Sequence, residues 1–341
     1  MNRLEIFFKS NRGADALLLA NYESADPNFV YFAGAEFDNS YLVAKKNGEA
    51  AILVSALNFE YAKEFCENKN FCVEKFERRS EALQKLARAL GRCRKIGVNK
   101  AFMSARTLDA LRAKTKRNFT DVSKSLDGQR ALKDRGEIEK IRTACALARK
   151  IIRETEIKAG ISERALSAEL QCAALSAGAK LAFEPIVLSG ADTRFPHGKS
   201  TEKRIRKNEI VLVDFGVRYE NYCSDVTRCF FTGACVEERE AYGRVKETFF
   251  DVARALRKNR KCREYARLAD LRLKKYGLPR LIHSLGHGVG LAVHESPSLG
   301  RNSKDVLRKN MAFALEPAFY GKKFGARYED VLVMGERAKC C

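Results

Sequence analysis

Three of the four histidines in the chain lie in one glycine-rich segment, HSLGHGVGLAVHES at residues 283–296, and the fourth, His197, lies in RFPHGKS. Imidazole titrates near neutral pH and is the commonest metal ligand in proteins. The spacing of His283 and His287 would suit a zinc pair on a helix, but the glycines between and after them disfavour that helix. The clustering therefore predicts a site, while the histidines alone leave its chemistry open.

Four carboxylates occur in segments that otherwise read as buried strands. Asp214 interrupts IVLVDFGV, a run that is apolar on both faces, and Asp225 follows eleven residues later in SDVTRCFF, where a turn would let the two meet across the ladder. Glu316 in AFALEPAF and Glu329 in RYEDVLV repeat this arrangement. An isolated buried charge is costly, so each carboxylate must be paired, protonated or bound to a metal ion.

Two explanations of these carboxylates remain open at this point. A single acid in a strand is more often salt-bridged than metal-bound, and the available partners are Arg218, Arg228 and Arg327. Four close anions beside an imidazole instead form the hard, oxygen-rich ligand set that suits two divalent ions. Such an ion pair, about 3.5–4 Å apart, can activate water and polarise a carbonyl group.

The elements that would position these groups begin with an α/β region in the first third of the chain. Short apolar runs predict strands over residues 16–21, 40–44 and 49–55, and the Asn-Gly turn in KKNGE predicts a hairpin between the last two. Helices are predicted over residues 58–68 and 79–91. We expect this region to form one domain, residues 1–128.

The rest of the chain, residues 129–341, is expected to form a second domain. Helical periodicity predicts helices over residues 135–160 and 163–178. Strand pairs are predicted over residues 209–233 and 310–335, with a helical tract at 237–276 between them. The order of strand pair, helix and strand pair suggests an internal duplication.

Composition excludes several classes of protein. The chain has 341 residues, enough for two domains, and no apolar run approaches the length of a membrane-spanning helix. Its N-terminal segment does not read as a signal peptide, so we expect a soluble, cytoplasmic protein with reduced cysteines. None of the eleven cysteines forms a C-x-x-C pair, which gives a thiolate zinc site little support.

The net charge of +21 raises the possibility of a nucleic-acid partner. The densest basic tract, residues 257–280, reads as helix with a solvated basic face beside a buried apolar one. Zinc-finger and RNP motifs are missing from the sequence, and aromatic residues do not interleave with the basic ones. We therefore expect no specific nucleic-acid partner.

Five separated motifs occur in an order that resembles one known family. VDFG, SDVTR, GHGVGLAVHESP, LEP and RYEDV are similar to the motifs of the pita-bread metallopeptidases, the family of creatinase, aminopeptidase P and prolidase. The likeness covers roughly residues 130–337. It implies a small creatinase-like N-terminal α/β domain and a C-terminal pita-bread catalytic domain of α+β type, built from a duplicated strand pair and helix.

The resemblance also implies five ligands for two divalent ions. Asp214 would chelate one ion, and Asp225 and Glu329 would bridge both. His287 and Glu316 would bind the second ion, and Glu316 would also move a proton. The resemblance implies manganese in preference to cobalt, iron or zinc.

Four further residues receive roles through the same resemblance. His197, His283 and His294 would hold the substrate and donate hydrogen bonds to the oxyanion of a tetrahedral intermediate, where such a donor can contribute about 3–4 kcal/mol. Arg327 would organise the substrate end of the site. It differs from Glu329 by two positions, so a strand would place both on one face.

The resemblance implies hydrolysis of the peptide bond before proline in short Xaa-Pro peptides, as in Xaa-Pro dipeptidase (prolidase), by a homodimer. An Xaa-Pro aminopeptidase, similar to aminopeptidase P, is the main alternative. A metal-free creatinase-like hydrolase and a non-catalytic binding module share the fold, but both would be expected to have altered ligand positions. All five positions are intact in this chain.

Overall fold

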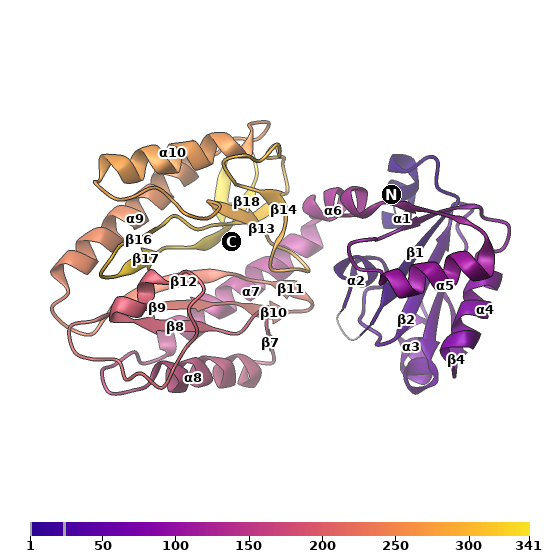
Figure 1. Cartoon of the computed structure of the whole chain (residues 1–341), viewed down its shortest axis with the longest axis horizontal. Coiled ribbons are helices and arrows are strands. Elements are labelled where there is room, and N and C mark those ends of the chain that lie inside the picture. The colour runs from indigo at the N-terminus through magenta and orange to yellow at the C-terminus, as the bar shows by residue number, and fades with distance from the viewer. Residues whose placement is uncertain (1, 23–24) are drawn as a thin grey trace. The chain divides into compact units, whose positions relative to one another are not determined.

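The computed structural model describes residues 2–22 and 25–341, and the chain divides into two units, Met1–Arg130 and Ala131–Cys341 (Figure 1). Within the described residues, the N-terminal unit contains a six-stranded sheet of order β4-β3-β2-β1-β5-β6. Its elements are α1 (Arg3–Ser10), β1 (Ala16–Asn21), α2 (Pro27–Ala33), β2 (Ser40–Lys45), β3 (Ala50–Ser55), the 3₁₀ turn Ala56–Asn58, α3 (Phe59–Cys66), β4 (Cys72–Phe76), α4 (Arg79–Ala89), β5 (Lys95–Val98), α5 (Ala105–Thr115), β6 (Asn118–Asp121) and α6 (Ser123–Ala131).

Helices cover both faces of this sheet because alternate strand residues point to opposite sides. Leu17 and Leu42 join a core with residues of α1, α2 and α3. Leu18 and Val43 join a separate core with residues of α4 and α5. The hairpin predicted at KKNGE is confirmed, since β2 and β3 pair antiparallel around it.

The C-terminal unit carries the segments with the clustered histidines and carboxylates. Its elements are α7 (Arg135–Glu154), α8 (Glu163–Ser176), β7 (Lys180–Leu181), β8 (Ile186–Ser189), the 3₁₀ turn Gly190–Arg194, β9 (Ile210–Phe215), β10 (Val217–Tyr219), β11 (Tyr222–Cys223), β12 (Val226–Phe231), α9 (Val236–Ala255), α10 (Cys262–Lys275), β13 (Gly286–Gly288), β14 (Glu295–Ser298), β15 (Ala312–Leu315), β16 (Ala318–Tyr320), β17 (Gly325–Arg327), β18 (Asp330–Met334) and β19 (Ala338–Cys340).

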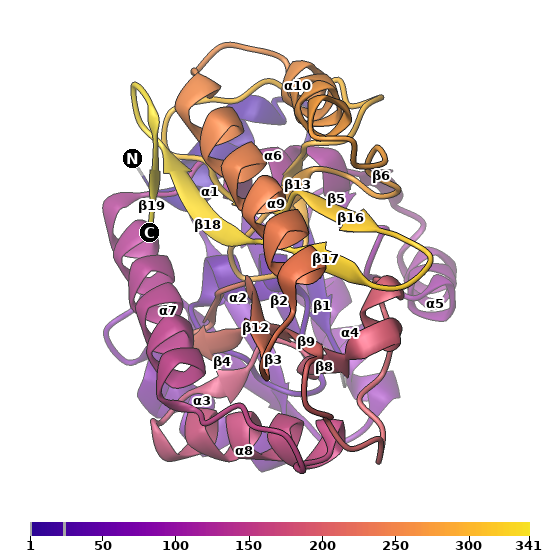
Figure 2. The same ribbon diagram turned by 90° about the vertical axis from the view of Figure 1, so that its left-hand side faces the viewer.

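Two similar halves make up this unit, as the duplicated pattern predicts. In the first half, α7 and α8 pack against the sheet β12-β9-β8 through a core that includes Val213 and Phe215. In the second half, α9 and α10 pack against β15 and β18 through a core that includes Phe249, Phe313 and Leu332. Figure 2 shows α9 crossing the strands of the second half, with α7 and α8 on the side of the first half.

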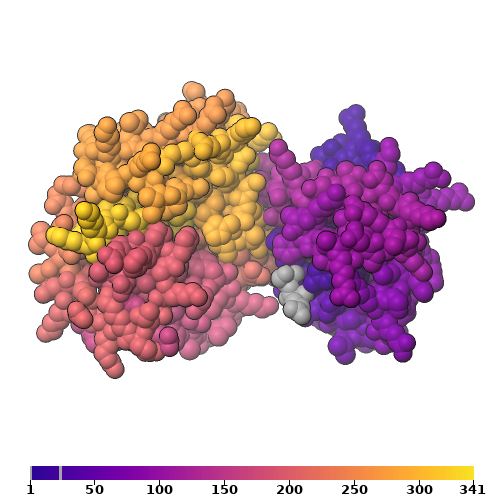
Figure 3. All heavy atoms as spheres, in the orientation of Figure 1, coloured from indigo at the N-terminus to yellow at the C-terminus, as the bar shows by residue number. Residues whose placement is uncertain are grey.

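The two halves meet where β12 passes the segment before β18. Thr227 forms an isolated antiparallel bridge with Glu329, and the Glu329 amide donates to the Thr227 carbonyl at 3.2 Å. On its other side, Thr227 is the ladder partner of Asp214 in β9. In the space-filling view, the segments coloured salmon and yellow adjoin at the surface of this unit (Figure 3). The carboxylates of the site therefore come from both halves.

The structure differs from the sequence predictions at three places. The pair predicted over residues 209–233 is interrupted at Gly216, because β9 pairs with β8 and β12 whereas β10 pairs with β7 and β11 in a separate sheet. As a result, Asp225 precedes β12 rather than facing Asp214 across the ladder. The helix predicted to reach residue 160 ends at Glu154, because the next residue, Thr155, adopts an extended backbone with ψ 126° although its amide still donates to the Ile151 carbonyl. Across residues 2–22 and 25–341, no helix has the length and apolarity needed to span a membrane.

Candidate metal centre

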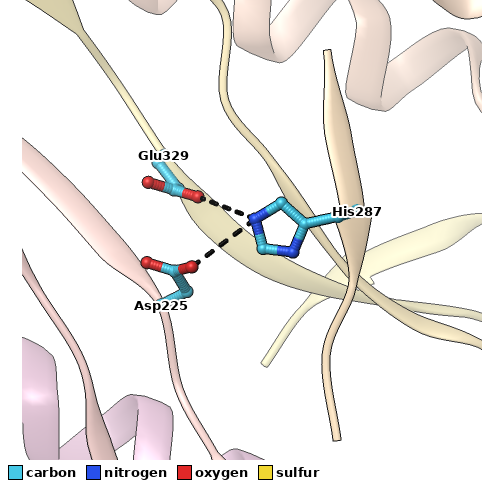
Figure 4. A group of neighbouring side chains, drawn as sticks. All are labelled: Asp225, His287 and Glu329. Atoms are coloured by element: carbon cyan, nitrogen blue, oxygen red, sulfur yellow. Dashed lines mark ion pairs between the residues drawn. The ribbon is translucent and has the colours of Figure 1, made fainter. Parts of the chain in front are cut away.

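His287 on β13 faces three carboxylates at similar distances. Its Nε2 lies 3.5 Å from Asp225 Oδ2, 3.8 Å from Glu316 Oε1 and 3.9 Å from Glu329 Oε1. One ligand atom each from Asp225, His287 and Glu329 all lie within 4.8 Å of one another, and Figure 4 shows these three side chains converging. The separations are at or beyond the limit of a hydrogen bond, so the ligand atoms surround a common point without bonding directly.

The hydrogen bonding of His287 favours the tautomer in which Nε2, the nitrogen that faces the three carboxylates, carries no proton. Burial lowers the pKa of His287 to about 4, so the ring is neutral at pH 7. Its Nδ1 lies 3.2 Å from the Gly288 carbonyl oxygen, which can only accept, so Nδ1 carries the single ring proton. Nε2 therefore presents a lone pair to the three carboxylates, as an imidazole that binds a metal through Nε2 must.

The glycine beside His287 is required by the neighbouring strand. A Cβ at Gly288 would collide with the carbonyl oxygen of Ser296 in β14. The absence of a side chain there lets β13 lie close to β14 on one side while it pairs with β15 on the other. The glycine pattern thus serves strand packing, which in turn holds the imidazole in place.

The carboxylates repel one another in the absence of a cation. Burial, followed by the charge of Glu329, raises the pKa of Asp225 well above its usual range. Burial, followed by the charge of Glu316, does the same to the pKa of Glu329. Burial raises the pKa of Glu316 to about 8, although Arg327 opposes the rise. Such acids either hold protons or need positive charge between them, and divalent ions supply that charge.

Asp214 uses one carboxylate oxygen for a salt bridge and leaves the other free. Its Oδ2 accepts a hydrogen bond from Arg327 Nη2 at 2.6 Å. Its Oδ1 is buried and has no hydrogen-bond partner within the described part of the chain. A buried oxygen without a partner is costly, so this atom fits a metal ligand better than a finished salt bridge. The donor set as a whole therefore fits divalent ions.

Arg327 and His283 are linked through a residue that sequence reasoning missed. The hydroxyl of Tyr320 accepts a hydrogen bond from Arg327 Nη1 at 3.0 Å and lies 3.2 Å from His283 Nε2. His283 Nδ1 lies 2.7 Å from the Ser284 carbonyl oxygen, and burial lowers the His283 pKa to about 4. The neutral ring therefore donates from Nδ1 to Ser284 and accepts from Tyr320 at Nε2. His283 can donate to a substrate only by giving up one of these contacts.

The other two histidines line the same cavity. The ring of His294 lies against that of His287, with centroids 4.1 Å apart, and burial lowers its pKa while Asp214 opposes the shift. A cavity of about 440 Å³ brings together all nine residues predicted from the sequence, namely His197, Asp214, Asp225, His283, His287, His294, Glu316, Arg327 and Glu329.

Thr227 and Tyr320 are two polar residues in contact with the site residues that the sequence analysis did not single out. Thr227 donates to Glu329 at 2.6 Å and accepts from Arg327 at 2.9 Å. The sequence could have indicated Thr227, because it follows Asp225 by two residues, a spacing that places two side chains on the same face of an extended segment. Tyr320 follows Glu316 by four residues, an even spacing that would have indicated the same side of a strand.

The histidine–carboxylate cluster in the cavity of the C-terminal unit has the donor groups that a metal-dependent hydrolase needs. The chain belongs to metallopeptidase family M24, whose model matches residues 139–336, and the creatinase/prolidase N-terminal domain model matches residues 9–132. This confirms the family and the fold that the five motifs imply.

Individual relatives extend the similarity to nearly the whole chain. A Xaa-Pro dipeptidase of Pyrococcus horikoshii is 32% identical over 337 residues, which cover 96% of this chain and 92% of that one. A solved prolidase structure from P. horikoshii OT3 is similar with a TM-score of 0.90 at 30% identity, covering 99% of this chain and 96% of that chain. An X-Pro aminopeptidase structure from Thermotoga maritima also has a TM-score of 0.90, at 28% identity and 97% coverage of each chain.

Proposed function

We propose that this chain is a metal-dependent Xaa-Pro dipeptidase of the prolidase type, which hydrolyses the peptide bond before proline. The observation that carries the proposal is the position of His287 Nε2, which faces the carboxylates of Asp225, Glu316 and Glu329 at 3.5–3.9 Å in a cavity of about 440 Å³. The similarity to Xaa-Pro dipeptidases over most of the chain supports the substrate class.

Five residues would hold two divalent ions. Asp214 would bind one ion through its unpartnered Oδ1, and Asp225 and Glu329 would contact both. His287 and Glu316 would bind the other. When bound, the ions would supply an activated water and a polarised scissile carbonyl.

The protein's own groups would then orient the substrate and move the proton. Glu316 would carry the proton, as the family resemblance implies, because it lines the cavity beside His287 Nε2, 3.8 Å from its Oε1. His294 and His197 line the cavity and can donate to the carbonyl oxygen as it becomes negative. Arg327 holds Asp214 and Tyr320 in place and would organise the substrate end through them.

An Xaa-Pro aminopeptidase is the second candidate, favoured by the likeness to the T. maritima X-Pro aminopeptidase structure. The two candidates differ in the length of the peptide that they accept. We propose to assay Ala-Pro against Arg-Pro-Pro peptides with manganese or cobalt added. Preference for Ala-Pro would support the dipeptidase, preference for the longer peptide the aminopeptidase, and cleavage of neither would contradict the specificity for proline.

A metal-free creatinase-like hydrolase or a binding module is disfavoured by the complete ligand set. The structural likeness to the N-terminal domain of an SPT16 subunit, at 18% identity, concerns the fold alone.

The proposal further includes manganese as the preferred ion, with cobalt, iron and zinc as alternatives. It also includes a homodimer, a cytoplasmic location, and functional domains at residues 1–128 and 129–341. These rest on the family resemblance and on the composition of the chain.

A further inference from the structure

The hydroxyl of Thr227 lies between two charged groups of the site. Arg327 Nε is 2.9 Å from Thr227 Oγ1, and Glu329 Oε2 is 2.6 Å from the same oxygen. A guanidinium can only donate, so the hydroxyl accepts from Arg327 and must direct its single proton to Glu329. Thr227 has no exposed surface, and water therefore cannot replace either contact. The direction of both hydrogen bonds is thus determined by the chemistry of the neighbours.

This hydrogen bond fixes how the Glu329 carboxylate is turned. Oε2 is held by Thr227 and lies 3.9 Å from Arg327 Nε, while Oε1 faces His287 Nε2. A short hydrogen bond to a carboxylate is stronger than one between neutral groups, so it resists rotation of the Glu329 side chain. Oε1 is thereby presented to the point shared by His287 and Asp225 before any ion is bound.

The same contacts connect carboxylates from the two halves of the unit. Arg327 binds Asp214 of the first half through Nη2 and Thr227 through Nε. Thr227 then binds Glu329 of the second half, and its backbone pairs with both Asp214 and Glu329. A change at Thr227 would therefore affect how both carboxylates are presented.

We propose that Thr227 is a positioning residue that sets the affinity of the centre for divalent ions, an inference that rests on the proposed metal site. Residues that orient a metal ligand from behind commonly change metal affinity about 10–100-fold when they are replaced. The hydroxyl group is the part that matters, because only it contacts Arg327 and Glu329.

Three variants of Thr227 separate the role of its hydroxyl from that of the rest of its side chain, and a fourth variant elsewhere serves as the control. Thr227→Val replaces the hydroxyl by a methyl group of similar size. Thr227→Ser and Thr227→Ala both lack the threonine methyl group and differ from each other only in the hydroxyl. Thr248→Val is the matched control, since Thr248 is an equally buried threonine on α9 whose hydroxyl binds only the Arg244 carbonyl within the described residues.

The measurement is the binding of Mn²⁺ alone to metal-free protein by calorimetry, with the thermal transition of each metal-free variant recorded beside it. We expect the Val and Ala variants at position 227 to bind Mn²⁺ about 10–100-fold more weakly than the parent. The Ser variant should bind nearly as tightly as the parent, and Thr248→Val should be unchanged. A purely structural role would lower the thermal transition without this separation of Ser from Ala.

Two results would overturn the inference and are distinguishable. If the parent binds Mn²⁺ and Thr227→Ala binds it as tightly as Thr227→Ser, Thr227 does not set the affinity, while the metal site itself stands. If the parent fails to bind Mn²⁺ at all, the proposed metal centre fails and this inference fails with it. Should Thr227→Val not fold, the comparison of Ser with Ala decides the question.

Discussion

Arg327 and Asp214 form a buried salt bridge of 2.6 Å between β17 and β9, strands from the two halves of the C-terminal unit. The guanidinium occupies one oxygen of the carboxylate, and the other has no hydrogen-bond partner among residues 2–22 and 25–341. Arg327 therefore does two things. It offsets part of the negative charge of the site, and it fixes the oxygen that Asp214 can offer to a metal ion.

Replacement of Arg327 by lysine tests the second of these effects. Lysine keeps the charge but cannot contact Asp214, Thr227 and Tyr320 together with one planar group. We expect kcat/KM for Ala-Pro to fall about 10–100-fold, the effect of losing about 1.5–3 kcal/mol of hydrogen bonding to charged groups. Steady-state kinetics at saturating metal measures this change. Activity equal to that of the parent would show that the positive charge alone suffices.

Two aspartates of the same unit should respond to neutralisation in opposite ways. Asp225 is surrounded by other acids, so Asp225→Asn removes a repulsive group and should raise the Tm of the metal-free protein at pH 8 by about 2–4 °C for each kcal/mol gained. Asp330 instead accepts from Arg228 at 2.6 Å and Arg149 at 2.8 Å. Asp330→Asn should destabilise the protein by about 1.5–3 kcal/mol.

Activity provides the second readout for this pair of variants. Asp225→Asn should lose metal-dependent hydrolysis despite its higher stability, because stability gained at a functional group is commonly obtained at the expense of activity. Calorimetry without metal and peptide assays with metal measure the two effects. A lower Tm for metal-free Asp225→Asn would contradict the repulsion inferred among the carboxylates.

The stability of the metal-free protein should fall as the pH rises from 6.5 to 8. The pKa of Glu316 is about 8 in the folded protein against 4.5 ordinarily, so over this range the folded state holds a proton that the unfolded chain has lost. The loss amounts to about 2 kcal/mol from Glu316 alone. His283 and His287, with pKa values lowered to about 4, oppose this loss, mainly below pH 6.5 and by only about 0.4 kcal/mol each between pH 6.5 and 8.

Denaturant unfolding at both pH values, with a chelator and with added Mn²⁺, checks this pH dependence. Bound ions keep the carboxylates ionised, so the stability of the metal-loaded protein should not fall between pH 6.5 and 8. If the metal-free protein is equally stable or more stable at pH 8, the acids of the site are not strained by burial and mutual repulsion.

His287 and His294, whose rings lie in tilted contact, should separate metal binding from catalysis. His294→Ala should retain the bound ions and lose about 100–1000-fold in kcat, the effect of removing one donor to a developing oxyanion. His287→Ala should instead lose metal affinity, because Nε2 of His287 faces the carboxylates. Metal content and kcat measured on the same samples test the distinction. Equal metal loss in both variants would place His294 among the ligands.

Local sequence patterns were sufficient to predict the hairpin at KKNGE and to indicate a site from the clustered histidines and from the carboxylates in apolar strands. An Asn-Gly turn and a carboxylate inside an apolar strand are properties of a few neighbouring residues, so they can be recognised without tertiary information. The order of the five motifs supplied the rest. The end of α7 at Glu154 was missed because it depends on the extended backbone of Thr155, which the apolar periodicity of the helix does not reveal.

The partners of the charged groups could not be chosen from the sequence. Arg218, Arg228 and Arg327 were equivalent candidates, and only the fold brings Arg327 to Asp214 and takes Arg228 to Asp330. The same holds for Tyr320, whose contacts with Arg327 and His283 join residues from separate strands and loops. Such contacts depend on how distant segments pack, which a single sequence does not encode in any local pattern.

Hydrolysis of Ala-Pro during the addition of Mn²⁺ to metal-free protein tests the central claim most directly, with Ala-Ala as the matched peptide. The account predicts no cleavage of Ala-Pro without metal, activity that rises until about two ions are bound, and little cleavage of Ala-Ala throughout. Cleavage of Ala-Pro that persists after complete metal removal, or a fully loaded protein that does not cleave it, would contradict the account.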